Sequence, residues 1–261
     1  MTEMTPIDEA HAAMQAAPED DAVRLRFYER LADSELFLML TEEAQGDTIT
    51  PDLFELPDAT FALVFDRAER LSGFAESAVP YAALSGRAIV GMLAGQGIGL
   101  GLNLEVAPSS ILIPPAAIDW LAATLAEAPA EVEERIAEFS RPAGLPESLL
   151  RALDTKLALA RGLARTAYLV GTTSESGAKG HLLAFIDAKD EARGALAKAA
   201  GEALTFSGLD AGVLDVGFFA AQDSRALARH GLRFDLPAAP EPARAVPVAP
   251  GSDPNKPPIL R

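Results

Sequence analysis

The strongest constraint on the fold is an alternation of strand-like and helical segments that occurs twice, on either side of a break in the chain. Short runs rich in β-branched and aromatic residues are bounded by Gly, Pro or Asp and alternate with segments whose apolar residues recur at helical spacing. The break, residues 128–146, contains Pro129, Pro142 and Pro146 around an acidic run. This pattern predicts an α/β (α+β) protein with two small mixed-sheet domains and helices packed on the sheets.

The alternation also predicts where the domains begin and end. We expect a first domain over residues 1–128, a linker with a short helix over 129–146 and a second domain over 147–235. The last 26 residues, 236–261, contain eight prolines and almost no aromatic residues. This composition predicts a disordered, proline-rich tail.

Individual elements follow from the same spacing. Predicted helices cover residues 7–17, 22–33, 66–75, 87–94, a segment beginning at Pro114-Pro115, 147–163, 189–204 and 223–230. Predicted strands cover residues 36–40, 52–56, 60–65, 79–84, 98–102, 111–113, 167–172, 181–187 and 213–220. In the helix 22–33, Val23, Phe27 and Leu31 share one face, which we expect to be buried, while Glu29 lies elsewhere.

Charge is distributed unevenly along the chain. Residues 1–140 contain 25 acidic residues against seven arginines and no lysine, a net charge of −18, whereas residues 141–261 contain 13 acids and 15 bases, a net charge of +2. Proteins that bind polyanions use clustered Lys and Arg, so the acidic half argues against nucleic acid or an anionic membrane as partner. It is compatible with a protein partner that has a basic surface, or with a solvated face that keeps the protein soluble.

The chain contains no cysteine, which excludes disulfides, thiolate metal sites, cysteine nucleophiles and persulfide transfer. Glu3, Asp8 and Glu9 near the N-terminus are the opposite of a secretory leader. Residues 88–104 carry no charge, but five glycines favour a buried strand over a membrane span. We therefore expect a cytoplasmic protein that does not bind membranes.

No constellation of residues specifies a reaction. No nucleophile or orienting carboxylate lies at a catalytic-motif spacing from any of the three histidines, His11, His181 and His230. No Gly-x-Ser-x-Gly motif occurs either. Calcium-loop and His-x-x-x-His spacings are also missing, so no metal and no cofactor is predicted. We expect no catalytic residues and no enzymatic activity.

A glycine-rich strand is the one segment of the sequence that suggests a ligand. Its glycines, Gly95, Gly97, Gly99 and Gly101, fail the dinucleotide fingerprint because leucine stands where the third glycine is needed. Alternation places them on one face and Ile98, Leu100 and Leu102 on the other. The bare face allows close backbone packing, and it also leaves room for a peptide strand or for a small ligand bound by these glycines, Tyr81 and Asn103.

Several core segments together carry a family resemblance. They are residues 26–31 (RFYERL), 36–38 (LFL), 61–66 (FALVFD), 80–84 (PYAAL) and 99–103 (GLGLN) in the first half, and 165–170 (RTAYLV) and 213–216 (VLDV) in the second. The first set resembles the N-terminal domain of the SseB family, although Leu104 stands where that family often has proline. The second set is similar, more weakly, to the SseB C-terminal domain. The resemblance spans residues 23–235 and implies a bacterial cytosolic protein named for a serine-sensitivity phenotype, without an established enzymatic activity.

These observations leave three hypotheses. The first is a non-catalytic interaction or regulatory protein. The second is a sensor that binds an amino acid or metabolite at the glycine-rich strand. The third is an adaptor whose PxxP segments, at Pro237, Pro240, Pro247 and Pro250, bind a partner. The sequence assigns no oligomeric state.

Overall fold

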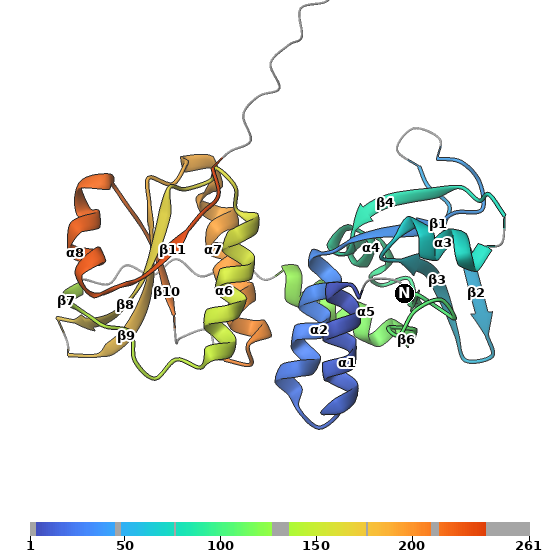
Figure 1. Cartoon of the computed structure of the whole chain (residues 1–261), viewed down its shortest axis with the longest axis horizontal. Helices are drawn as coiled ribbons and strands as arrows, with labels where there is room; N and C mark the ends of the chain where they lie inside the picture. The colour runs from blue at the N-terminus through green and yellow to red at the C-terminus, as the bar shows by residue number, and fades with distance from the viewer. Residues whose placement is uncertain are drawn as a thin grey trace, which may run out of the picture.

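Two α/β lobes lie side by side, and each is built on one mixed β-sheet (Figure 1). The computed structural model describes residues 4–44, 48–75, 77–126, 136–175, 177–209 and 214–238. Within these residues the first sheet has six strands and the second has five. Both sheets contain parallel and antiparallel pairs, so the predicted fold class is confirmed.

The first lobe begins with a helical hairpin that precedes its sheet. Its helices are α1 (Pro6–Ala16), α2 (Asp21–Asp33), α3 (Ala68–Ala75), α4 (Gly86–Leu93) and α5 (Pro115–Ala126). Its strands are β1 (Glu35–Met39), β2 (Leu53–Leu56), β3 (Ala59–Phe65), β4 (Tyr81–Ser85), β5 (Ile98–Leu102) and β6 (Ile111–Ile113). The strand order is β4-β1-β3-β5-β6, and β2 pairs with β3 beyond the end of β1. Among the described strands of this sheet, only β3 and β5 run parallel to each other, so the residues that follow these two strands meet at one edge of the sheet.

Helices cover both faces of this sheet. On one face, Leu36, Val64 and Leu100 pack with apolar residues of α2, α4 and α5 in the main core. On the other face, Leu63 and Phe65 pack with Leu71 of α3. The split follows from the two-residue period of a strand, which sends alternate side chains of β3 to opposite faces.

The second lobe repeats this three-layer plan. Its helices are α6 (Glu147–Leu159), α7 (Arg193–Phe206) and α8 (Ser224–His230), with short 3-10 turns η1 (Asp190–Ala192) and η3 (Ala221–Asp223). Its strands are β7 (Ile136–Ser140), β8 (Thr166–Ser174), β9 (Lys179–Ile186), β10 (Asp215–Phe219) and β11 (Leu232–Asp235), in the order β10-β9-β8-β11 with β7 also on β8. The helices α6 and α7 cover one face and α8 covers the other.

Most predicted elements are present, and β5 and β6 have the bounds that the sequence predicts. Two edge strands are not predicted, β7 and β11. The strand β7 lies inside the predicted linker, and the short helix predicted there does not cover residues 136–140. These residues extend instead, because they pair with β8 and place Phe139 against its core. Residues 129–135 of the linker and 239–261 of the predicted tail lie outside the described residues.

Candidate functional site

The structure separates the residues of the predicted ligand site. Tyr81 lies on edge strand β4, is 51% exposed and packs edge-to-face on Phe37. The glycines lie in or just before β5, and β1 and β3 stand between the two strands. Tyr81 and the glycine-rich segment therefore do not line one shared site.

The glycines allow close packing within the lobe. Gly95 and Gly97 adopt positive φ values of 73° and 70° in the turn between α4 and β5, a conformation that glycine accommodates without strain. A Cβ atom on Gly99 would lie 2.3 Å from the carbonyl oxygen of Ile113 and 2.7 Å from the ring of Phe61. Ile113 and Phe61 thus fill the space beside the β5 backbone at Gly99, as the close-packing interpretation expects.

Asn103 lies where the parallel strands β3 and β5 end. It is fully buried in the left-handed region, with φ at 49°. Its Nδ2 donates to Ser109 Oγ at 2.9 Å, and its Oδ1 accepts from the backbone N–H of Asp66 at 3.1 Å. The Asn103 amide therefore ties the ends of the two strands together.

A buried charge cluster surrounds this amide, and we call it the N-lobe cluster: Asp8, Asp66, Arg70 and Ser109. The guanidinium of Arg70 donates to Asp8 at 2.5 and 3.0 Å and to Asp66 at 2.8 Å. Ser109 Oγ donates to Asp8 Oδ1 at 2.6 Å. The cluster fastens α1, which carries Asp8, to α3 and to the strand ends.

The helix cap of α1 completes this arrangement. Thr5 Oγ1 accepts from the backbone N–H of Asp8 and donates to Asp66, so one hydroxyl caps the helix and joins the cluster. Burial opposes ionisation of Asp8, but hydrogen bonds from Arg70, Ser109 and Thr5 outweigh it and hold the pKa of Asp8 well below its usual range. The hydrogen bond to Asp8, followed by the charge of Asp66, raises the pKa of Arg70.

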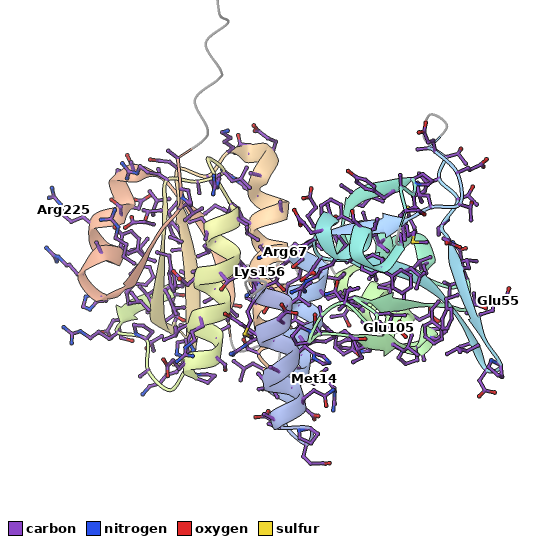
Figure 2. All side chains as sticks on the ribbon, turned by 45° about the vertical axis from the view of Figure 1, so that its right-hand side comes forward. Met14, Glu55, Arg67, Glu105, Lys156 and Arg225 are labelled. Carbon is purple, nitrogen blue, oxygen red and sulfur yellow. The ribbon has the colours of Figure 1, made fainter. Side chains whose placement is uncertain are left out.

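A second cluster joins the two lobes, and we call it the interdomain cluster: Glu29 and Asp33 of α2, Arg87 of α4, Lys156 of α6 and Glu202 of α7. Its side chains are buried except for that of Arg87, which is 39% exposed. The Nζ of Lys156 lies 2.7 Å from Asp33 and 2.9 Å from Glu202, so one ammonium bridges a carboxylate from each lobe. The Lys156 side chain is only 4% exposed. Figure 2 shows it between the lobes, where the helices of the second lobe meet α2.

Arg87, which belongs to the first lobe, also bridges a carboxylate from each lobe. It donates to Asp33 at 2.5 Å and to both carboxylate oxygens of Glu202, at 3.1 and 3.2 Å. Burial penalises ionised Glu202, but hydrogen bonds from Arg87 and the charge of Lys156 lower its pKa. Burial likewise opposes the charge of Arg87, and its carboxylate partners nevertheless raise its pKa.

Glu29 is the weakly compensated member of the interdomain cluster. Its Oε1 has no hydrogen-bond partner, and Lys156 Nζ is 3.7 Å away. The pKa of Glu29 is raised to about 7. Burial makes the largest contribution and Asp33 also raises the pKa, while Lys156, Arg30 and Arg26 lower it. With Glu29 ionised the cluster holds three carboxylates and two cations, and protonation of Glu29 makes it neutral.

An apolar contact lies beside the interdomain cluster. Phe206, at the C-terminal end of α7, is buried within the main core of the first lobe. The Nζ of Lys156 stands 5.8 Å from the centre of the Phe206 ring. The lobes are therefore held together both by desolvated charge and by an aromatic side chain of one lobe in the core of the other.

In both clusters the charged side chains pair with one another and hold elements of the fold together. A paired, ionised lysine is a poor nucleophile. Within the described residues, no three His, Asp or Glu side chains converge as a metal site requires.

The sequence analysis does not predict the two charge clusters, although the sequence contains patterns that indicate some of their members. Lys156 is buried with Leu149 and Leu153 at helical spacing, so a lysine stands on the apolar face of a predicted helix. Asp66 directly follows a buried strand and precedes Arg70 by one helical turn. Glu29, expected away from the core, is buried because the second lobe covers that side of α2.

Two surface cavities have opposite charge. One, of about 610 Å³, lies at the turn between α1 and α2 and is lined by Glu19, Asp20 and Asp21 together with Ser207-Gly208 of the second lobe. The other, of about 460 Å³, lies in the second lobe and includes Arg141 and Arg229. A further cavity of about 350 Å³ lies against Tyr28 and Trp120, whose rings pack edge-to-face.

The first lobe matches a known domain family. The family model of the SseB protein N-terminal domain aligns with residues 7–120, from the start of α1 into α5. The first lobe is an SseB N-terminal domain. The match includes all four residues of the N-lobe cluster and, of the interdomain cluster, Glu29, Asp33 and Arg87. The likeness of the second lobe to the SseB C-terminal domain stays a prediction.

Other comparisons add no function to the SseB assignment. Neither the curated proteins nor the solved structures contain a match to this chain. None of the described helices is both long enough and apolar enough to cross a bilayer.

Proposed function

We propose that this protein is a non-catalytic cytoplasmic protein that acts by binding a protein partner with a basic surface. The observation that carries the proposal is strand β2, which presents apolar side chains to solvent. Leu53, Phe54 and Leu56 are 40%, 41% and 38% exposed, and Glu55 between them is also exposed. Apolar residues gathered on one exposed strand are typical of an interaction surface.

The position of β2 suits the addition of a partner strand. It pairs antiparallel with β3 and, among the described strands, with no other. Figure 2 shows Glu55 at the outer margin of the first lobe, far from the interdomain cluster. Exposed edges are usually protected by charged or short strands, and a partner segment that pairs with such an edge gains backbone hydrogen bonds and side-chain contacts.

The charge around β2 supports a basic partner. Residues 31–66 contain nine acids and neither lysine nor arginine. Within the described residues, Glu43, Glu55 and Asp58 are exposed and form no ion pair. An acidic field of this kind accelerates association with a positively charged surface and weakens as salt is added.

The two buried clusters support a role without catalysis. The Arg70 guanidinium and the Lys156 ammonium are both taken up by ion pairs that hold the structure together. They pair with carboxylates of the protein rather than facing one of the three cavities, because none of those cavities is lined by a cluster residue.

A capture experiment with matched variants tests the proposal. Immobilised full-length protein is compared with Phe54→Ser, and with Leu159→Ser, which removes a 61% exposed apolar side chain from the second lobe. We expect one basic protein to be retained at low salt by the wild type and Leu159→Ser but lost with Phe54→Ser. Identical capture by all three, or no specific capture at low salt, would contradict the proposal.

A further inference from the structure

The second lobe contains a groove at a break in the edge of its sheet. Strand β9 occupies one edge of β8 from Thr166 to Thr173. On the other edge, β11 pairs with residues 166–169 and β7 with 171–174, so these two strands follow one another along β8. Residue 170 lies at the junction, where β7 has ended and β11 has not begun.

The cavity of about 460 Å³ opens beside this junction, and we call it the basic groove. One wall is the loop Arg141–Leu145, which follows β7, together with Leu150 of α6; the other is Arg229–Leu232, where α8 ends and β11 begins. The volume is in the range of sites for small organic ligands.

The charges of the basic groove are not compensated locally. Its lining contains Arg141, Arg229 and His230 but no aspartate or glutamate. Neither arginine forms an ion pair with any of the described residues, although several other arginines of the protein do. A cavity without acids is notable in a chain that has 38 acidic residues against 22 basic ones.

Helix electrostatics account for only part of this pattern. Arg229 and His230 lie in the last turn of α8, where cations complement the helix dipole. Arg141 belongs to a different element and caps no helix end, yet it lines the same cavity. Two arginines without ion pairs, from separate segments, line one cavity, and such an arrangement is typical of a site for an anion.

The remaining lining is apolar, with Leu145, Leu150 and Leu232 beside the arginines. We propose that the basic groove binds a small organic anion whose carboxylate or phosphate pairs with Arg141 and Arg229 while its hydrocarbon part lies on these leucines. The site is independent of the proposed partner surface: Figure 2 shows Arg225 of α8 and Glu55 of β2 at opposite ends of the molecule.

The net charge of the protein does not prevent this binding. The excess of acids belongs to residues 1–140, whereas residues 141–261 carry +2. Charges separated by more than a Debye length, about 8 Å at physiological salt, are largely screened at the surface. The acids of the first lobe therefore weaken the field of the two arginines only slightly.

Titration of the full-length protein followed by amide NMR tests the inference. Gly144 and Gly231 line the groove and serve as reporters. Octanoate and octyl phosphate are the anionic probes, and octylamine is the matched cation. We expect saturable shifts of both glycine signals with at least one anion and none with octylamine. If octanoate binds more tightly, the group that the arginines recognise is a carboxylate; if octyl phosphate binds more tightly, it is a phosphate. Absence of saturable shifts with both anions, or equal shifts with octylamine, would overturn the inference.

Variants then connect the binding to the two guanidinium groups. We expect Arg141→Gln/Arg229→Gln to bind the preferred anion at least about tenfold more weakly, since each charge-assisted hydrogen bond to an anion is worth this much or more. Arg161→Gln, at the opposite end of α6, changes another exposed arginine and is expected to leave the affinity unchanged. Both positions 141 and 229 are exposed, so the double variant is expected to unfold at the wild-type urea midpoint. Undiminished affinity in the double variant would also overturn the inference.

Discussion

The N-lobe cluster and the interdomain cluster are both groups of largely buried acids and bases, but they differ in how completely their carboxylates are hydrogen-bonded. In the first, Asp8 accepts hydrogen bonds from Arg70 and Ser109, and its pKa is far below the usual range. In the second, Glu29 has an oxygen without a donor, and its pKa is raised to about 7. A carboxylate with donors to both oxygens keeps its charge at every physiological pH, whereas one with an unbonded oxygen titrates. The N-lobe cluster also has an unbonded atom, Arg70 Nε, but a guanidinium does not lose its proton in this range.

The difference follows from where the clusters lie. The N-lobe cluster forms within one lobe, where α3, the N-cap of α1 and the residues after β5 provide donors to both oxygens of Asp8. The interdomain cluster assembles only when the lobes meet, and it combines two acids of α2 with Glu202 around two cations. We therefore expect the first to set the stability of the lobe and the second to make the junction between lobes sensitive to pH.

Removal of the Arg70 charge is expected to have the largest effect. Arg70→Met leaves Asp8 and Asp66 buried without a cation, and loss of one member of a buried ion pair lowers the free energy of unfolding by about 3–5 kcal/mol. Urea denaturation followed by circular dichroism measures the loss. Arg67→Met, three residues earlier and without an ion pair among the described residues, is the control and is expected to change stability by less than about 0.5 kcal/mol. Equal effects of the two variants would show that the N-lobe cluster does not support the lobe.

The corresponding change in the interdomain cluster is expected to cost somewhat less. Lys156→Met leaves Arg87 to compensate Asp33 and Glu202, so we expect a loss of about 2–4 kcal/mol, greater at pH 8 than at pH 5 because the unpaired carboxylates can be protonated at the lower pH. Urea denaturation at both pH values measures it, with Lys189→Met, an exposed lysine, as control. A loss that is the same at pH 5 and pH 8 would argue against a titrating junction.

The smallest effect is expected from Glu29 and has the opposite sign. Because the pKa of Glu29 is about 7 in the folded protein and 4.5 ordinarily, the folded protein binds more protons than the unfolded chain between these values, and stability falls as pH rises through this window. Glu29→Gln removes the penalty and is expected to raise the free energy of unfolding by about 1–3 kcal/mol at pH 8, with little change at pH 4.5. Glu202→Gln is the contrast: its pKa is lowered, so its loss is expected to destabilise at pH 8. Destabilisation by Glu29→Gln at pH 8 would contradict the charge assignment.

The sequence predicts the elements better than it predicts their contacts. The helix α2 and the strand β5 are defined by local apolar periodicity, so their bounds are found within a residue. The strands β7 and β11 are missed because each has few buried side chains and is fixed by pairing with β8, a partner distant in the sequence.

The same limit applies to the site residues. Asn103 is singled out by its position after the glycine-rich strand, but its partners Ser109 and Asp66 follow from tertiary structure. The burial of Glu29 depends on a second lobe that no local pattern places against α2.

The pKa of Glu29 is the most direct test of a titrating junction between the lobes. A carbon-detected NMR titration of the Glu29 side-chain carboxyl in the full-length protein measures it without perturbing the cluster. We expect a midpoint near pH 7, because burial opposes the third negative charge of the interdomain cluster. A midpoint near 4.5, the ordinary value for glutamate, would contradict this account of how the two lobes are joined.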